Sequence, residues 1–171
     1  TSASLVELQG QEFDGEFICN FKQKPEEGPH THVAFGYAAQ VVVLNDEGKL
    51  DQVYAAHDVG RAMNPALCKA QIEGAIHQGL GFALTETMPC TDGRPDSVRL
   101  TDLQIIRAKH MPSIEVQLLE IPDPHTAYGV KGVGEIGLVP TAAAVASALH
   151  AFDGLRRHTL PMRGSAAARA L

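Results

Sequence analysis

Residues 64–84 read NPALCKAQIEGAIHQGLGFAL and form the stretch that decides the fold class. Asn64 belongs to the residue types preferred before a helix, and Pro65 suits the first helical position. Apolar residues then recur at helical spacing at Ile72, Ala75, Ile76, Gly79, Leu80, Ala83 and Leu84. The stretch therefore predicts a long helix that turns one side toward a core.

The opposite side of this helix combines two amides with two glycines, at Gln71, Gly74, Gln78 and Gly81. A glycine inside a helix costs about 1 kcal/mol relative to alanine, so a close approach of another group to this side would account for both glycines. The alternative is ordinary helix packing, in which glycines let two backbones come close. Both interpretations fit the spacing.

Strand patterns flank the helix. Residues 33–44 and 50–58 are β-prone and are separated by turn residues at 45–48, which predicts a β-hairpin. A further strand is expected at 114–121, before the Pro-Asp-Pro at 122–124. A short strand within residues 5–24, then a loop at 25–29, is expected near the start.

A second helix is expected over the alanine-rich residues 141–152, ending at Asp153-Gly154. Residues 88–97 contain two prolines and a glycine and predict a loop. Strands and helices do not alternate in βαβ units, so the prediction is an α+β fold with a mixed β-sheet and packed helices. At 171 residues, one domain over 1–171 is expected.

The composition excludes several classes of protein. The formal net charge of -6, without long charged runs, argues against nucleic-acid and anionic-membrane partners. No apolar run reaches the roughly 18 residues of a membrane span, and residues 1–11 lack a signal-peptide pattern. The odd, widely spaced Cys19, Cys68 and Cys90 predict buried thiols in a reducing compartment. We therefore expect a cytoplasmic protein.

Residues 132–137 read GVGEIG and match the spelling of a dinucleotide-binding GxGxxG. Such a site needs a preceding strand and a second strand ending in an acid, and neither condition holds here. What remains is a loop whose glycines let backbone amides converge beside Glu135, before a helix N-terminus that favours anions. It predicts an active-site loop. The alternative is a turn whose Glu135 points to solvent or caps the next helix.

Histidines offer two further candidates. His30 and His32 could bind a metal, but a convincing third ligand is missing. His57 and Asp58 could form part of a triad, but no serine or cysteine lies in a recognisable nucleophile setting. Neither pair is predicted to be a catalytic centre, and no side chain is predicted to bind a metal directly.

Three stretches, taken in order, resemble the molybdopterin-binding region of the xanthine dehydrogenase, aldehyde oxidase and carbon monoxide dehydrogenase family. They are residues 57–65 (HDVGRAMNP), 71–81 (QIEGAIHQGLG) and 131–135 (KGVGE). The resemblance covers about residues 30–154, and residues 33–44 look most like bacterial members. The chain is similar to the C-terminal segment of the family's large, molybdenum-binding subunit.

The resemblance assigns roles to individual residues. Glu135 takes the position of the family's active-site glutamate and is expected to be the general base. Gln71 is expected to hydrogen-bond the pterin, which agrees with the amide and glycine side of the helix. Asn64 is expected to contact the dinucleotide end of the cofactor. The residues expected to shape the loop around the cofactor are Lys131, Gly132, Val133 and Gly134.

The implied cofactor is a molybdenum-molybdopterin, expected in its cytosine dinucleotide form, with the metal held through the pterin. The implied reaction hydroxylates an electron-poor carbon of a purine, such as xanthine or hypoxanthine, or of an aldehyde, with water as the oxygen source. Iron–sulfur clusters and FAD are expected on other domains or subunits, because the chain has no cluster-type cysteine pattern. An oligomer is expected.

This chain also departs from the family. Family subunits are several-fold longer, so the remainder of the molybdenum subunit is an expected partner and the isolated chain is predicted to be inactive. The family tail often places Thr-Pro after a Leu-Pro, whereas here Leu160-Pro161 is followed by Met162-Arg163. The alternative function is an inactive scaffold or binding module that keeps the fold without the chemistry.

Overall fold

The computed structural model describes residues 10–12 and 34–171. The chain divides into two compact units, Thr1–Val33 and Ala34–Leu171, and all of the described helices and strands lie in the second unit. The strand and loop expected within residues 5–29 fall outside the described residues except at 10–12, and so do His30 and His32.

The predicted hairpin is confirmed. β1 (Ala38–Leu44) pairs antiparallel with β2 (Leu50–Asp58). In the turn between them, the Oδ1 atom of Asn45 accepts hydrogen bonds from the backbone amides of Glu47 and Lys49, both at 3.0 Å. Gly48 adopts a left-handed φ of +76°, which glycine tolerates best. The turn thus satisfies its own polar groups and sets the register of the two strands.

A third strand completes a mixed sheet. β5 (Ser113–Leu119) pairs parallel with β2, so the strand order is β1-β2-β5. A parallel pair needs a crossover connection, which here contains the long helix α2. The strand ends two residues before the predicted limit at 121. The combination of a mixed sheet with packed helices confirms the α+β fold class.

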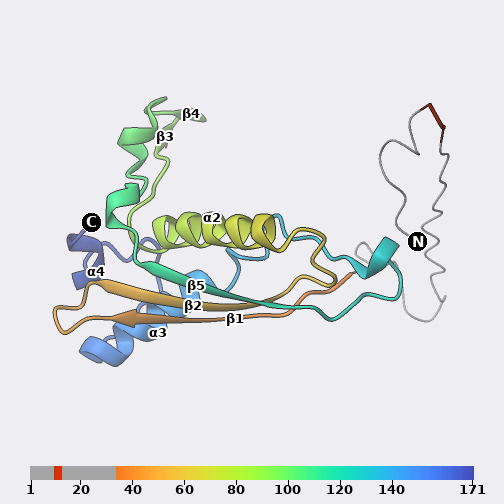
Figure 1. Cartoon of the computed structure of the whole chain (residues 1–171). Helices are drawn as coiled ribbons and strands as arrows, with labels where there is room; N and C mark the ends of the chain where they lie inside the picture. Colours follow the sequence, from red (N-terminus) through yellow and green to blue (C-terminus); the bar gives the residue numbers. More distant parts are fainter. Residues whose placement is uncertain (1–9, 13–33) are drawn as a thin grey trace, which may run out of the picture. The chain divides into compact units, whose positions relative to one another are not determined.

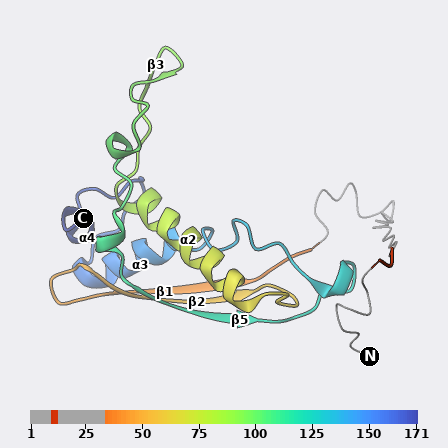
Figure 2. The same ribbon diagram turned by 45° about the horizontal axis from the view of Figure 1, so that its top comes forward.

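Helix α2 (Pro65–Leu84) begins and buries its residues as predicted. The Oδ1 atom of Asn64 accepts a hydrogen bond from the amide of Leu67 at 3.1 Å, which caps the helix. All seven residues of the predicted apolar side are buried. Figures 1 and 2 show α2 lying over the three-stranded sheet, and it contacts β5 and α3. The helix therefore supplies much of the core between sheet and helices.

The C-terminal part adds two helices. α3 (Thr141–Asp153) packs against β1 and ends at Gly154, whose φ of +72° matches the predicted glycine stop. The short α4 (Ala166–Arg169) is capped by the Ser165 side chain. The core of the unit consists of Val42, Val53, Ala55, Val59, Ile72, Ile76, Leu80, Ala83, Leu84, Ile106, Val116, Val145, Leu149, Met162 and Ala167.

The segment between α2 and β5 contains short elements that project away from the sheet and α2 (Figures 1 and 2). They are β3 (Cys90–Thr91), β4 (Arg94–Pro95) and the 3-10 helices η2 (Leu100–Leu103) and η3 (Ala108–His110). Cys90 is exposed and Cys68 is only half-buried, so the expectation of buried thiols is wrong for these two cysteines. The projecting hairpin has too little packing around it to bury a thiol.

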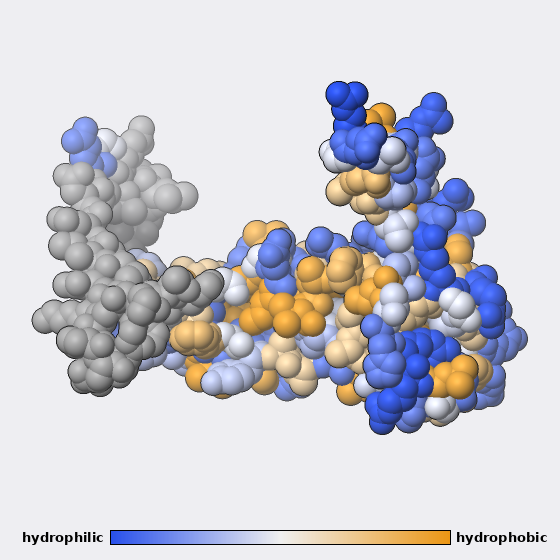
Figure 3. Space-filling model, turned by 180° about the vertical axis from the view of Figure 1, so that it is seen from behind, coloured by the Kyte–Doolittle hydropathy of each residue, from blue (hydrophilic) through white to orange (hydrophobic). Residues whose placement is uncertain are grey.

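Large apolar side chains remain at the surface, and Figure 3 shows hydrophobic surface on one face of the molecule. Val41 and Tyr54, on neighbouring strands of the sheet, are 60% and 47% exposed. Among the described residues, no helix is long and apolar enough to cross a bilayer.

Candidate functional site

The glycine-rich loop (residues 129–137) begins beside the end of β2. The backbone amide of Lys131 donates to the carbonyl of Val59 at 3.1 Å, and the amide of Arg61 donates to the carbonyl of Gly129 at 3.0 Å. Gly60 lies between them with a φ of +62°, and a Cβ atom there would lie 2.4 Å from the Gly129 oxygen. Only glycine fits, so the start of the loop is held tightly against the strand end.

A buried ion pair reinforces this contact. The Lys131 Nζ donates to the Asp58 Oδ2 at 2.5 Å, and the two side chains are 7% and 0% exposed. Burial alone would raise the pKa of Asp58, but the hydrogen bonds from Lys131 and from the Gly60 amide outweigh it and hold the pKa below its usual value. Asp58 therefore stays ionised and pairs with Lys131, and no triad forms with His57.

The middle of the loop is held by helix α2. The Nε2 of Gln71 donates to the carbonyl of Gly134 at 2.8 Å. This polar contact joins the amide side of α2 to the loop, so Gln71 does more than pack. The glycines of that side differ. Gly74 faces open space, whereas a Cβ atom at Gly81 would collide with the Glu86 side chain.

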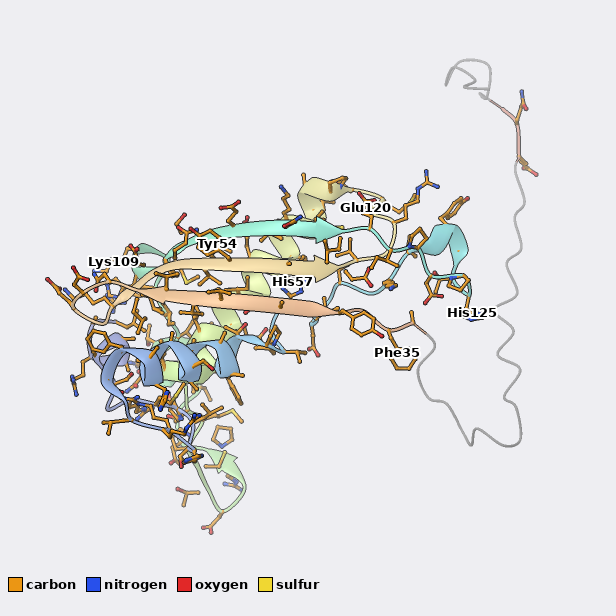
Figure 4. The ribbon with its side chains drawn as sticks, turned by 90° about the horizontal axis from the view of Figure 1, so that it is seen from below. Phe35, Tyr54, His57, Lys109, Glu120 and His125 are labelled. Atoms are coloured by element: carbon orange, nitrogen blue, oxygen red, sulfur yellow. The ribbon has the colours of Figure 1, made fainter. Side chains whose placement is uncertain are left out.

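The end of the loop is held by a buried polar network. The Nε2 of Gln40 donates to the carbonyl of Gly137 at 2.7 Å and lies 3.2 Å from the Nε2 of His57. The Oγ1 of Thr141 donates to the Oε1 of Gln40 at 2.8 Å. His57 is fully buried, and burial lowers its pKa. Figure 4 shows His57 on β2.

Glu135 occupies the part of the loop between these contacts and is exposed. Its carbonyl accepts a hydrogen bond from the Leu138 amide at 3.0 Å, and its carboxylate contacts no partner among the described residues. Helix α3 has Pro140 at its N-cap, without any side-chain cap. The interpretation of Glu135 as a helix cap is therefore wrong. Its exposed carboxylate agrees with the alternative that it points to solvent, and it is also open to a ligand.

Backbone amides around Glu135 are also free. Within the part of the chain that the structure describes, the amides of residues 132–137 donate no hydrogen bond. A Cβ atom at Gly132 or Gly134 would meet nothing within 4 Å, so a ligand can approach the backbone closely there. Free amides can donate hydrogen bonds to an anion or another acceptor-rich group.

A hollow of about 310 Å³ lies beside the loop. It brings together four of the predicted cofactor residues, Asn64, Gln71, Lys131 and Val133. Gly132, Gly134 and Glu135 lie on the same loop but do not line it. Its complete lining is Val59, Arg61, Met63, Asn64, Leu67, Cys68, Gln71, Val130, Lys131 and Val133.

Sequence reasoning missed several residues of this region. Arg61 lines the hollow and its guanidinium has no partner among the described residues, so it can pair with an anion. The sequence signal that could have identified Arg61 as an anion-binding residue is its position just before the N-terminus of a helix. Gln40 gave no local signal, because it reaches the Gly137 carbonyl from 97 positions away. Thr141 lies on the following helix and meets Gln40 across a similar distance in sequence.

Comparison with known proteins identifies the family. The family model of the molybdopterin cofactor-binding domain matches residues 3–112 of the chain. The chain belongs to this family. A xanthine dehydrogenase molybdenum-binding subunit of Escherichia coli O157:H7 is 34% identical over 116 residues, covering 66% of this chain and 15% of that protein. An isoquinoline 1-oxidoreductase subunit beta of Brevundimonas diminuta is 31% identical over 137 residues, or 79% of this chain and 17% of its own length.

Among solved structures, quinoline 2-oxidoreductase of Pseudomonas putida 86 superposes with a TM-score of 0.60 and 30% identity, over 67% of this chain and 15% of that one. The chain thus spans less than a fifth of the length of these relatives. It is a molybdopterin-binding domain of the molybdenum hydroxylase type, and its two sequence relatives are named as subunits of a dehydrogenase and an oxidoreductase.

The residues present fit such a cofactor. Free amides at 132–137 and the unpaired guanidinium of Arg61 provide donors for an acceptor-rich, phosphate-bearing pterin. No three His, Cys, Asp or Glu side chains gather into a metal site within residues 10–12 and 34–171.

Proposed function

We propose that this chain forms part of the cofactor site of a molybdenum hydroxylase and that Glu135 is the general base of the reaction. The observation that carries the proposal is the exposed, unpartnered Glu135 carboxylate, which lies within a run of free backbone amides on a loop anchored by Gln71. A carboxylate beside free donors can accept a proton next to a bound, acceptor-rich ligand.

Several residues would hold the cofactor. The Gln71 carboxamide fixes Gly134 and keeps its oxygen available for the pterin. Asn64 uses Oδ1 to cap α2, which leaves its amide nitrogen for the dinucleotide end. Lys131 contributes through the loop backbone, together with Gly132, Val133 and Gly134, because its ammonium group is committed to Asp58.

When bound, the molybdenum cofactor supplies the oxidation of a substrate carbon with oxygen taken from water. Glu135 then contributes the proton transfer. Its carboxylate takes the proton from the water-derived nucleophile, and such a positioned base accelerates a reaction by roughly 10²–10⁴-fold. The exposed position of Glu135 on the loop leaves its carboxylate free of competing hydrogen bonds within the described residues.

The proposed substrate is a purine, such as xanthine or hypoxanthine, or an aldehyde. The names of the relatives support this class, since xanthine and quinoline both carry an electron-poor carbon beside a ring nitrogen. The proposed cofactor form is the cytosine dinucleotide. Iron–sulfur clusters and FAD belong to partner domains or subunits of an oligomer in the bacterial cytoplasm.

The remainder of the molybdenum subunit is the proposed direct partner of this chain, and we propose that residues 1–171 act in it as one domain. The chain spans about 15% of its relatives' length, and apolar residues such as Val41 and Tyr54 remain exposed. We infer that the isolated chain is inactive, because it holds only part of the cofactor's contacts.

The test replaces Glu135 with glutamine in the molybdenum holoenzyme that contains this chain. Glutamine keeps the size and hydrogen bonding of glutamate but cannot accept the proton. We expect the rate of the reductive half-reaction to fall at least ~10²-fold, the low end for loss of a general base, at unchanged molybdenum content. Glu115→Gln, an exposed carboxylate on β5, is the matched control and should turn over like the parent.

The competing function is a scaffold that keeps the fold without the chemistry. It predicts equal turnover of the Glu135→Gln and Glu115→Gln holoenzymes at full molybdenum loading, and that result would refute the role of Glu135.

A further inference from the structure

We propose that His57 and Asp58, two consecutive residues at the end of β2, position Glu135 by holding the glycine-rich loop at both of its ends. The inference rests on the proposed function of Glu135 as the base. It assigns to His57 and Asp58 a role as positioning residues, which reach the reacting atoms only through the loop.

Asp58 holds the first end. Its Oδ2 accepts the hydrogen bond from the Lys131 ammonium group at 2.5 Å, and its Oδ1 accepts from the Gly60 amide at 3.0 Å. Both side chains of the ion pair are buried, so water competes little for either charge. Asp58 therefore fixes the residue that lies four positions before Glu135.

His57 holds the other end through Gln40. The Gly137 carbonyl can only accept, so the amide nitrogen of Gln40 must face it at 2.7 Å. The same nitrogen lies 3.2 Å from the His57 Nε2, which must then accept its second hydrogen. His57 is therefore neutral with its proton on Nδ1, an atom that is buried without a partner among the described residues.

This arrangement has a consequence for Gln40. The Oε1 of Gln40 accepts from Thr141, and its nitrogen donates to both Gly137 and His57, so three neighbours fix the orientation of the amide. A buried histidine with an unsatisfied Nδ1–H carries a cost in stability. That cost is understandable if the Nε2 of His57 is needed to aim Gln40 at the loop.

Between the two ends, no described group hydrogen-bonds or pairs with the Glu135 carboxylate, so the loop backbone sets where its side chain starts. Gln71 supports the loop at Gly134. Successive side chains of a strand leave on opposite faces, so His57 and Asp58 approach the loop from two sides of β2. A base that moves by about 1 Å can lose up to ~10²-fold in rate, so small slackening of either end should be measurable.

The experiment loosens each end separately in the molybdenum holoenzyme. The variant Asp58→Asn with Lys131→Met removes the first anchor without leaving a buried charge behind. Gln40→Met removes the second anchor. Asp153→Asn with Arg157→Met is the matched control, because it breaks an ion pair of the same 2.5 Å length at the exposed end of α3.

Three readouts are combined. We expect hydrogen–deuterium exchange to speed up in both anchor variants, and not in the control, at the loop amides that are hydrogen-bonded, those of residues 129–131 and 138. We expect kcat to fall about 10-fold or more with KM nearly unchanged, at full molybdenum content. In a Glu135→Gln background, the same anchor variants should cause no further loss, because the base that they position is gone.

Two results would overturn the inference. One is unchanged kcat in both anchor variants although Glu135→Gln alone lowers turnover ~10²-fold. The other is an equal further loss in the Glu135→Gln background, which would mean that the anchors act independently of Glu135. Intact turnover of Glu135→Gln alone would instead refute the proposed function itself, so the two failures are distinguishable.

Discussion

Two glycine-containing connections of this molecule differ in where their hydrogen-bond partners come from. The hairpin turn at 45–49 satisfies its polar groups locally, through Asn45 and an exposed pair between Lys49 and Glu47. The glycine-rich loop is held by residues 40, 58 and 71, far away in sequence, and leaves the amides of 132–137 free. The turn that connects two strands satisfies its polar groups from within, whereas the loop proposed to meet the cofactor is fixed by residues from elsewhere and leaves its donors open.

The largest expected effect on stability comes from the ion pair in the loop, Lys131 with Asp58, compared with the pair in the turn, Lys49 with Glu47. Lys131→Met leaves the Asp58 carboxylate buried without its cation and should destabilise the chain by about 3–5 kcal/mol. Lys49→Met removes an exposed pair that solvent screens, so its urea midpoint should match the parent's. Equilibrium unfolding in urea measures both. Equal midpoints for the two variants would show that the Lys131 pair is not a buried anchor.

The same pair gives the loop a pH dependence of stability. The folded-state pKa of Asp58 lies below its usual value, so its contribution is present above the unfolded pKa of about 3.9 and is lost as pH falls through the folded pKa. We expect the urea midpoint of the parent to fall more steeply below about pH 4 than that of Asp58→Asn with Lys131→Met. Parallel profiles for the two proteins would contradict this assignment.

Much of the scaffold was predictable because its signals are local. Asn64 and Pro65 mark the start of α2, and Gly154 marks the end of α3, since caps depend on a few neighbouring residues. The anchors of the loop were not predictable in this way. Lys131 meets Asp58 across 73 positions and Gln40 meets Gly137 across 97, and no periodicity records such pairings.

The site residues also differ in whether a local sequence pattern predicts them. Gln71 stood out from its own helix, because an amide and glycines share one side, and the structure shows it bonded to the loop. Lys131 is expected from the resemblance to help shape the loop around the cofactor, but a sequence cannot tell which partner a lysine side chain selects. Its burial against Asp58 became visible only once β2 and the loop lay side by side.

The next effect concerns cofactor retention. Gln71→Ala removes the hydrogen bond to Gly134 and the proposed pterin contact, and should weaken retention by about 1–3 kcal/mol, or roughly 5- to 150-fold. Molybdenum content after dialysis of the holoenzyme measures it. Gln117→Ala, an exposed amide on β5, serves as the control. Equal molybdenum retention in the two variants would refute the proposed contact between Gln71 and the pterin.

The smallest expected effect lies in the turn. Asn45→Ala removes two hydrogen bonds that the Oδ1 atom accepts from Glu47 and Lys49, in a position where water can replace part of what is lost. We expect about 1 kcal/mol of lost stability, which is a decrease of roughly 2–4 °C in Tm for a chain of this size. Because most amides of the turn are bonded within it, molybdenum content and turnover of the holoenzyme should stay at the parent's level. A loss of turnover larger than the loss of folded protein would show that the turn also serves the site, and the contrast between the two connections would fail.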